Sequence, residues 1–79
     1  MRLHEVLARA RALGMSVSYS EGEYRVAYPL FQHYARLYPL KSHGYWRERQ
    51  EVDAYYTDDA IDAYSTAIVM SKSLIKEAA

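Results

Sequence analysis

Two kinds of side chain in this 79-residue sequence could support chemistry at first sight: its histidines and its serines. His4, His33 and His43 lack the i, i+4 spacing or the cysteine partners of a zinc site, so we expect surface or partly buried histidines and no metal. Ser65 and Ser71 fall inside a predicted helix, whose backbone cannot hold a serine on the sharp exposed turn that a hydrolase needs. We expect both to be small residues at a packing seam.

The aspartates near residue 60 are a third candidate. Asp58 and Asp62 are four residues apart and share a helical face, so a paired acid or a divalent-ion site is geometrically possible. No loop with the oxygen spacing of an EF-hand accompanies them, and a helix start explains Asp58 and Asp59 through the helix dipole. The three glycines are isolated, so no phosphate-binding loop is expected. We therefore predict a non-enzymatic protein without a cofactor.

Net charge is zero, but the charges are unevenly distributed. Residues 1–50 carry eight Lys and Arg against four acids, whereas residues 51–79 carry two Lys against six acids. Residues 51–62 contain no base and five acids, namely Glu51, Asp53, Asp58, Asp59 and Asp62. Such a run is either a solvated face or an acidic surface for a basic partner.

Nine tyrosines are the extreme of the composition. A tyrosine joins a rigid ring to a polar tip and is common at protein interfaces and on nucleic-acid stacking platforms. Five are in phase with predicted core faces: Tyr19, Tyr24, Tyr28, Tyr56 and Tyr64. A second group is less tied to the core and could anchor a partner: Tyr34, Tyr38, Tyr45, Trp46 and Tyr55. Most of that group lies among basic residues of one segment, which could stack on bases, anchor a protein or close a thin core.

The elements that position these side chains follow from hydrophobic spacing. Residues 2–13 have a helical period, and Gly14 stands where a left-handed cap would end the helix. Residues 15–28 alternate around Glu21-Gly22-Glu23, which predicts a two-stranded hairpin. Pro29 ends the second strand, and residues 30–38 could form a short helix before a loop at 41–44.

The remainder predicts a strand and a long helix. Val52, Ala54 and Tyr56 alternate as in a strand, and Thr57 is a good N-cap for the helix that follows. The helical stripe comprises Ala60, Ile61, Tyr64, Ala67, Ile68, Ser71, Leu74, Ile75 and Ala78. We predict one α+β domain over residues 1–79, with two helices packed on one face of a three-stranded antiparallel sheet. The order is α-β-β-insertion-β-α, with an aromatic-rich insertion at about residues 30–51.

The order of helix, three strands and helix resembles a double-stranded-RNA-binding domain. That family has a lysine-rich start to its second helix, whereas the matching residues here are Thr57-Asp58-Asp59-Ala60-Ile61-Asp62. Carboxylates at that place would repel the phosphate backbone. We therefore expect no RNA binding by this surface.

A second resemblance concerns residues 55–70. Tyr55-Tyr56-Thr57-Asp58-Asp59, followed by Asp62-Ala63, Thr66-Ala67 and Met70, resembles a strand-to-helix pattern of small, mostly uncharacterised proteins of phages and other mobile elements. The resemblance implies a compact accessory protein, and one known role of such proteins is to block a host defence complex, as anti-CRISPR proteins do. It transfers no catalytic residue. A bacterial cytoplasm is the location that it implies, and the absence of cysteine suits a reducing compartment.

The sequence thus predicts a non-enzymatic inhibitor or adaptor, monomeric or a small homo-oligomer, that binds a bacterial nucleic-acid-handling complex such as a CRISPR-associated one. The predicted partner-binding residues are Glu51, Asp53, Tyr55, Asp58, Asp59, Asp62, Tyr34, Tyr38, Tyr45 and Trp46. The alternative is an accessory protein that binds single-stranded nucleic acid through the aromatic and basic insertion. No apolar run approaches the roughly 20 residues that span a bilayer, so no membrane partner is expected.

Overall fold

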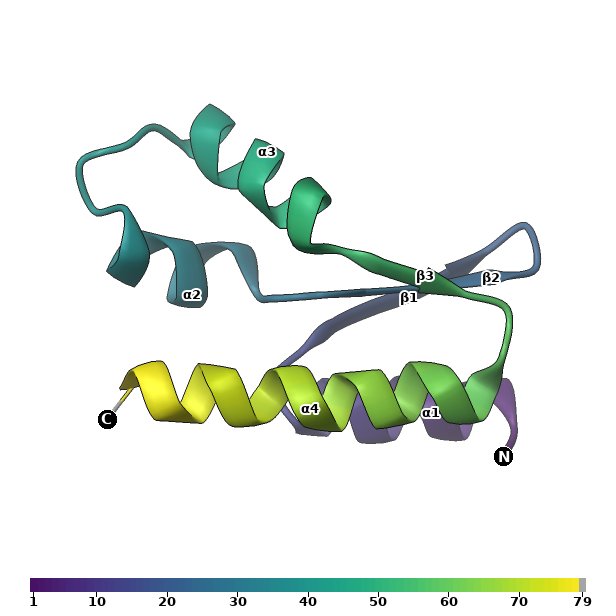
Figure 1. Cartoon of the computed structure of the whole chain (residues 1–79). Helices are drawn as coiled ribbons and strands as arrows, with labels where there is room; N and C mark the ends of the chain where they lie inside the picture. The colour runs from purple at the N-terminus through teal and green to yellow at the C-terminus, as the bar shows by residue number, and fades with distance from the viewer. Residues whose placement is uncertain (79) are drawn as a thin grey trace.

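A small antiparallel sheet organises the molecule. The structure, a computed structural model, describes the backbone of residues 1–78 and the side chains of residues 1–74. Its elements are α1 (Leu3–Ala12), β1 (Ser16–Ser20), β2 (Glu23–Ala27), α2 (Leu30–Leu37), α3 (His43–Asp53), β3 (Tyr55–Thr57) and α4 (Ala60–Ala78). The sheet order is β1-β2-β3, and α1 and α4 lie side by side on one face (Figure 1). The predicted α+β fold is therefore confirmed.

The main core lies between this helix pair and the sheet. Its buried members are Val6, Ala10, Met15, Val17, Tyr24, Val26, Ala63, Ala67 and Met70. Ala10 of α1 and Ala63 and Ala67 of α4 are all fully buried. Such small side chains permit a short interaxial distance between packed helices.

The stripe predicted for α4 is rotated relative to the buried face that the structure shows. Ile61 is 63% exposed, whereas Ala63 and Met70 are buried. The sequence places apolar residues around much of this helix, so the largest ones do not identify the inward face. Ser71 is buried as expected, but Ser65 is exposed. The side chains of residues 75 and 78 lie outside the described part of the chain.

The end of α1 has the predicted glycine cap. Gly14 has a φ of 87°, its N–H donates to the Arg11 carbonyl at 2.9 Å, and the Met15 N–H donates to the Ala10 carbonyl at 3.4 Å. This pair of bonds is a Schellman motif, which satisfies carbonyls at the helix end and turns the chain into β1.

Strand β1 is an edge of the sheet, and a side chain of α1 bonds to its backbone. The Arg11 guanidinium (Nη2) donates to the Val17 carbonyl at 3.1 Å. That carbonyl belongs to an edge strand, where backbone groups on the outer side have no partner strand. Arg11 thus occupies one acceptor along this edge.

The insertion between β2 and β3 is a helical hairpin, formed by α2, the loop at 38–42 and α3 (Figure 1). The predicted loop at 41–44 ends two residues too late and the third strand predicted from Val52 begins too early, because α3 occupies His43–Asp53. Ser42 caps α3, since its Oγ accepts the Tyr45 N–H at 3.3 Å. The third strand begins only at Tyr55.

Aromatic rings form the interior of this helical hairpin. Tyr34 is fully buried and Trp46 is 6% exposed. The Trp46 indole N–H donates to the Tyr38 carbonyl at 2.9 Å, and the Phe31 ring meets Trp46 edge-on at 5.6 Å. Two short helices have little stability on their own, so large rings supply the buried area that joins them. This explains the concentration of aromatic residues in residues 28–46.

The N-cap of α4 is Asp59 and not Thr57. The Asp59 carboxylate (Oδ1) accepts the N–H groups of Ile61 at 2.9 Å and Asp62 at 3.4 Å. Thr57 instead accepts the Asp59 N–H at 3.2 Å, so it shapes the turn that precedes the cap. A carboxylate at the start of this helix agrees with the role expected for these aspartates. The N-cap itself lies two residues later than predicted.

The β1–β2 turn contains a strained position that can be tested. Glu21 and Gly22 have φ values of 52° and 78°, as in a type I′ turn, and Glu21 is not a residue that favours this region. We predict that Glu21→Asn raises the free energy of unfolding by about 0.5–1 kcal/mol, because asparagine tolerates positive φ. Urea denaturation measures this change. The control is Glu21→Gln, which removes the same charge without that conformational preference; an equal gain from both would assign the effect to charge.

Candidate interaction surface

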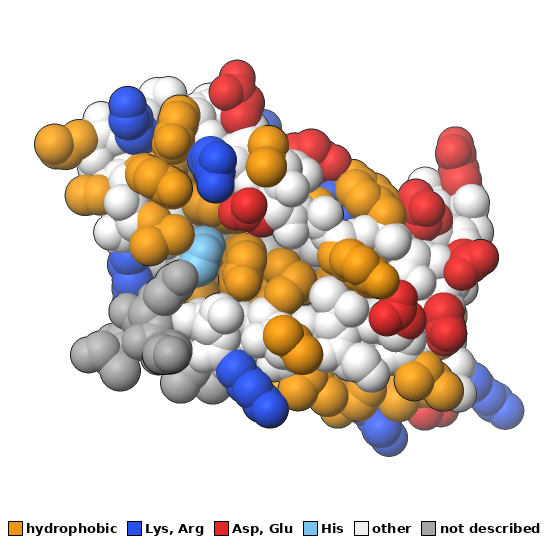
Figure 2. All heavy atoms as spheres, in the orientation of Figure 1, with side chains coloured by type: hydrophobic (Ala, Val, Ile, Leu, Met, Phe, Trp, Pro, Cys, Tyr) orange, Lys and Arg blue, Asp and Glu red, His pale blue; other side chains and the backbone are white. Residues whose placement is uncertain are grey.

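Acidic side chains from two separate parts of the chain meet at one end of the molecule. Glu21 and Glu23 lie at the β1–β2 turn, and the register that pairs Tyr24 with Thr57 brings Glu23 beside Asp58. Figure 2 shows red side chains gathered at this right-hand end. We name this group the acidic end, which comprises Glu21, Glu23, Asp58, Asp59 and Asp62. None of the five forms an ion pair with a residue that the structure describes.

Exposed apolar side chains border the acidic end. The Tyr55 hydroxyl donates to the Asp62 carboxylate (Oδ2) at 2.7 Å, and this hydrogen bond raises the pKa of Tyr55. Tyr55 remains 41% exposed and Ile61 is 63% exposed. A partner at this end would therefore meet carboxylates together with a ring that is already fixed in position.

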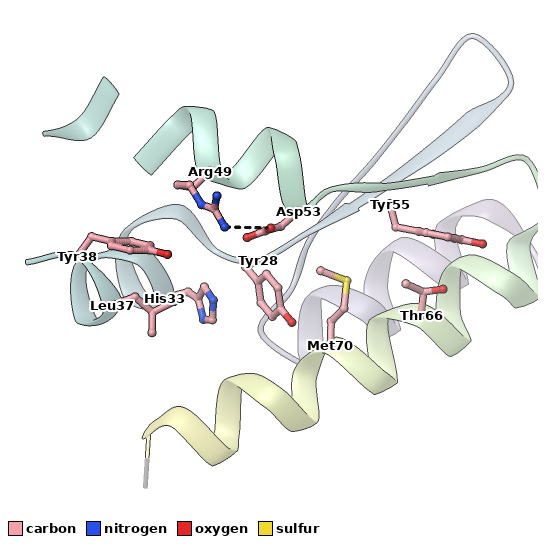
Figure 3. A pocket seen from close by; sticks show the side chains of 9 residues that line it. All are labelled: Tyr28, His33, Leu37, Tyr38, Arg49, Asp53, Tyr55, Thr66 and Met70. Carbon is pink, nitrogen blue, oxygen red and sulfur yellow. Dashed lines mark ion pairs between the residues drawn. The ribbon is translucent and has the colours of Figure 1, made fainter. Parts of the chain in front are cut away.

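A groove adjoins Tyr55 and separates the helical hairpin from α4 (Figure 3). Its volume is about 480 Å³, and it is open to solvent. Residues from both sides and from the junctions of the strands line it, namely Tyr28, His33, Leu37, Tyr38, Arg49, Asp53, Tyr55, Thr66 and Met70. Because Tyr55 lines the groove and its hydroxyl bonds to Asp62, the groove and the acidic end adjoin each other.

The polar wall of the groove is a linked set of α2 and α3 side chains. Arg49 (Nη2) lies 3.8 Å from the Asp53 carboxylate (Oδ1), as the dashed line in Figure 3 marks. The Tyr34 hydroxyl donates to Asp53 (Oδ2) at 2.7 Å. Burial, and then this hydrogen bond to a carboxylate, raise the pKa of Tyr34 far above its ordinary value. Asp53 is therefore held by two partners inside the protein.

Glu51 lies elsewhere, on the sheet face opposite α1 and α4. It accepts a hydrogen bond from the Tyr56 hydroxyl and pairs with Arg25 (Nη2 to Oε2, 2.8 Å). Arg25 and Tyr56 are register partners on β2 and β3, so this contact fastens α3 to the sheet. The hydrogen bond from Tyr56, followed by that from Arg25, lowers the pKa of Glu51.

The structure thus divides the acidic run of residues 51–62 among three places. Only Asp58, Asp59 and Asp62 share the acidic end, whereas Asp53 lies in the groove wall and Glu51 on the opposite sheet face. The sequence reasoning missed Glu21 and Glu23. The predicted hairpin could have indicated them. In an antiparallel meander, the turn between the first two strands lies at the same end of the sheet as the end of the third strand.

The predicted aromatic anchors are divided as well. Tyr34 and Trp46 are buried, so in this structure they support the helical hairpin and offer no ring face to a partner. Tyr38 lines the groove. The Tyr45 ring packs edge-on against the Tyr38 ring, with 5.1 Å between the ring centroids. Tyr55 is the one of the five that borders both surfaces.

Two further features that a site could include are a metal centre and a membrane-spanning helix. Among the described residues, no three His, Asp or Glu side chains are placed to hold a metal ion. Within the same part of the chain, no helix is long and apolar enough to cross a membrane.

No protein-family model matches the sequence, and no curated protein or solved structure matches it either. The functional conclusion therefore depends on the geometry of these surfaces.

The contact between Glu51, Arg25 and Tyr56 predicts a pH dependence. A carboxylate whose pKa is lowered in the folded state stabilises the fold above its unfolded pKa of about 4.3, and this contribution is lost as the pH falls through the folded value. We expect Glu51→Gln to lower the stability at pH 7 and to reduce its fall between neutral and acidic pH, as measured by urea denaturation across that range. Glu48→Gln, an exposed acid on the same helix, is the control. An unchanged acid profile in Glu51→Gln would contradict the assignment.

Tyr34 predicts a dependence of stability on alkaline pH, in contrast to the acid dependence expected from Glu51. Because its pKa is raised in the folded protein, the stability that it contributes is present below the unfolded pKa of about 10 and is lost as the pH rises above it. We expect Tyr34→Phe to cost about 1–2 kcal/mol at neutral pH and to make the alkaline loss of stability shallower. Tyr45→Phe is the matched control, since its hydroxyl makes no hydrogen bond with the described residues. Equal alkaline slopes in the two variants would rule out this role.

Proposed function

We propose that this protein is a non-enzymatic binding module that docks its acidic end on the basic surface of a nucleic-acid-handling protein and excludes nucleic acid from it. The observation that carries the proposal is the convergence of five carboxylates from the β1–β2 turn and the start of α4. The chain is electrically neutral overall, so this concentration of charge at one end is a local feature.

The unpaired state of the acidic end supports this proposal. Glu51 and Asp53 form ion pairs within the fold, whereas the five carboxylates of the acidic end have no such partner among the described residues. Neighbouring like charges repel one another and stabilise nothing by themselves, although Asp59 also caps α4. A cationic surface shaped for phosphates would relieve that repulsion and compete directly with a nucleic acid.

The adjoining groove would add contact area and specificity. Charged contacts at a rim mainly accelerate association, whereas buried aromatic and apolar anchors account for most of the binding free energy. Tyr55 lies where the two features join, and Leu37 and Met70 give the groove apolar walls. A side chain of the partner placed in this groove would supply such an anchor. An inhibitor of a bacterial nucleic-acid-handling complex, as the phage-protein resemblance implies, would act in this way.

Binding of single-stranded nucleic acid is less well supported. Stacking requires exposed ring faces, and Trp46 and Tyr34 are buried in the helical hairpin. The acidic end would also repel the phosphates of an approaching strand.

Competition with labelled DNA tests the proposal on bacterial nucleic-acid-handling complexes, including CRISPR-associated ones. We expect the wild-type chain to displace DNA, and the variant Asp58→Asn, Asp59→Asn, Asp62→Asn to do so at least about tenfold less well at low salt. Asparagine at position 59 retains a capping oxygen, so α4 should remain folded.

The control is Glu48→Gln, which neutralises an exposed acid on α3, outside the acidic end. This variant should compete like the wild type. If the triple variant binds and competes normally while circular dichroism shows an intact fold, the charge mechanism is excluded.

A further inference from the structure

The loop of the helical hairpin carries the opposite charge to the acidic end. Leu40, in this loop, is 98% exposed. Exposed bases surround it in the sequence, Arg36 in the last turn of α2, Lys41 in the loop and Arg47 in α3. We name Arg36, Leu40, Lys41 and Arg47 the basic tip. The exposed ionisable neighbours on α3 are His43 and Glu48, so the bases predominate.

The basic tip and the acidic end lie at opposite ends of an elongated molecule. The molecule extends 39 × 27 × 14 Å, and in Figure 1 the helical hairpin and the β1–β2 turn point away from each other. Figure 2 shows the same separation, with the gathered acids distant from the hairpin. The N-terminus of α1 lies at the same end of the molecule (Figure 1). The basic tip and the acidic end are thus two separated concentrations of opposite charge on a chain that is neutral overall.

We propose that this chain binds a second copy of itself head to tail, with the basic tip of one copy on the acidic end of the next. Charge complementarity identifies the occupant, because the molecule carries both halves of the contact. The exposed Leu40 gives the basic tip an apolar centre, and the exposed Ile61 and Tyr55 give the acidic end an apolar border. A protein with no net charge also lacks the mutual repulsion that keeps charged proteins apart.

The geometry predicts the form of the assembly. The two surfaces are different and lie at opposite ends, so the contact is heterologous, and each added copy leaves one free surface of each kind. Association is therefore open-ended and grows with concentration. The inference does not depend on the proposed function, but a basic partner protein would compete with the neighbouring copy for the acidic end.

Sedimentation velocity of the whole chain tests the inference. We expect the average mass to rise between about 10 μM and 1 mM protein at about 20 mM salt, and to fall towards the monomer at about 300 mM salt, where charges are screened beyond a few ångströms. Two charge-reversed variants separate the surfaces. One carries Lys41→Glu and Arg47→Glu, and the other carries Glu21→Lys, Glu23→Lys and Asp58→Lys, all of which are exposed positions outside the caps.

Each reversed variant alone should remain monomeric, because its two ends then carry the same sign. Their equimolar mixture should associate again, because one variant keeps the basic tip and the other keeps the acidic end. Arg9→Glu with Lys72→Glu is the control for net charge, since it changes the charge as much as the tip reversal does but at exposed positions elsewhere, and it should retain more association than the tip reversal.

Three results would overturn the inference. They are a wild-type monomer at 1 mM and low salt, association that persists in either reversed variant, and a mixture that fails to associate. Binding of the wild type, but not of the tip-reversed variant, to phosphatidylserine vesicles without self-association would assign the basic tip to a membrane surface instead.

Discussion

The hydroxyl of Tyr34, buried between α2 and α3, is the contact on which the rest of the structure depends. It donates to Asp53 at the end of α3, immediately before β3, and its ring fills the interior of the helical hairpin. Two short helices have little stability on their own, so this bond acts together with the contact of Glu51 with Arg25 and Tyr56 to define where the third strand begins. By fixing the end of α3, Tyr34 positions β3, and through β3 the start of α4 with its carboxylates. The groove wall and the acidic end therefore share one internal support.

Local signals in the sequence predicted the parts of the fold that local chemistry determines. The glycine after α1, the alternation around Gly22 and the order of the elements were all sufficient for this. The third strand exists, but its predicted start at Val52 is wrong, because an alternation this short cannot be distinguished from the last turn of a helix. Residues at the end of α3, Gln50, Glu51 and Asp53, bond to distant parts of the chain, which holds that region in the helix. The spacing of apolar residues does not reveal such long-range contacts.

The candidate surface was only partly predictable for a related reason. A run of acids along the chain says little about their positions in space, because consecutive residues here belong to a helix end, a strand and a cap. Glu51 and Asp53 pair with Arg25 and Arg49, which the sequence does not place beside them. Sheet register instead brings in Glu23 from more than thirty residues away. The result is a neutral chain with charge separated along its long axis, which is the basis of both proposals.

The guanidinium of Arg11 on the carbonyl of Val17 has a separate consequence. A five-residue edge strand with small polar side chains on one face is a template for cross-β growth, in which strands of other molecules add along the backbone. A cation bound at an outward carbonyl removes one site for that growth and places a positive charge, with its hydration shell, in the path of an incoming strand. The edge of the sheet at β1 is thus partly protected against cross-β growth.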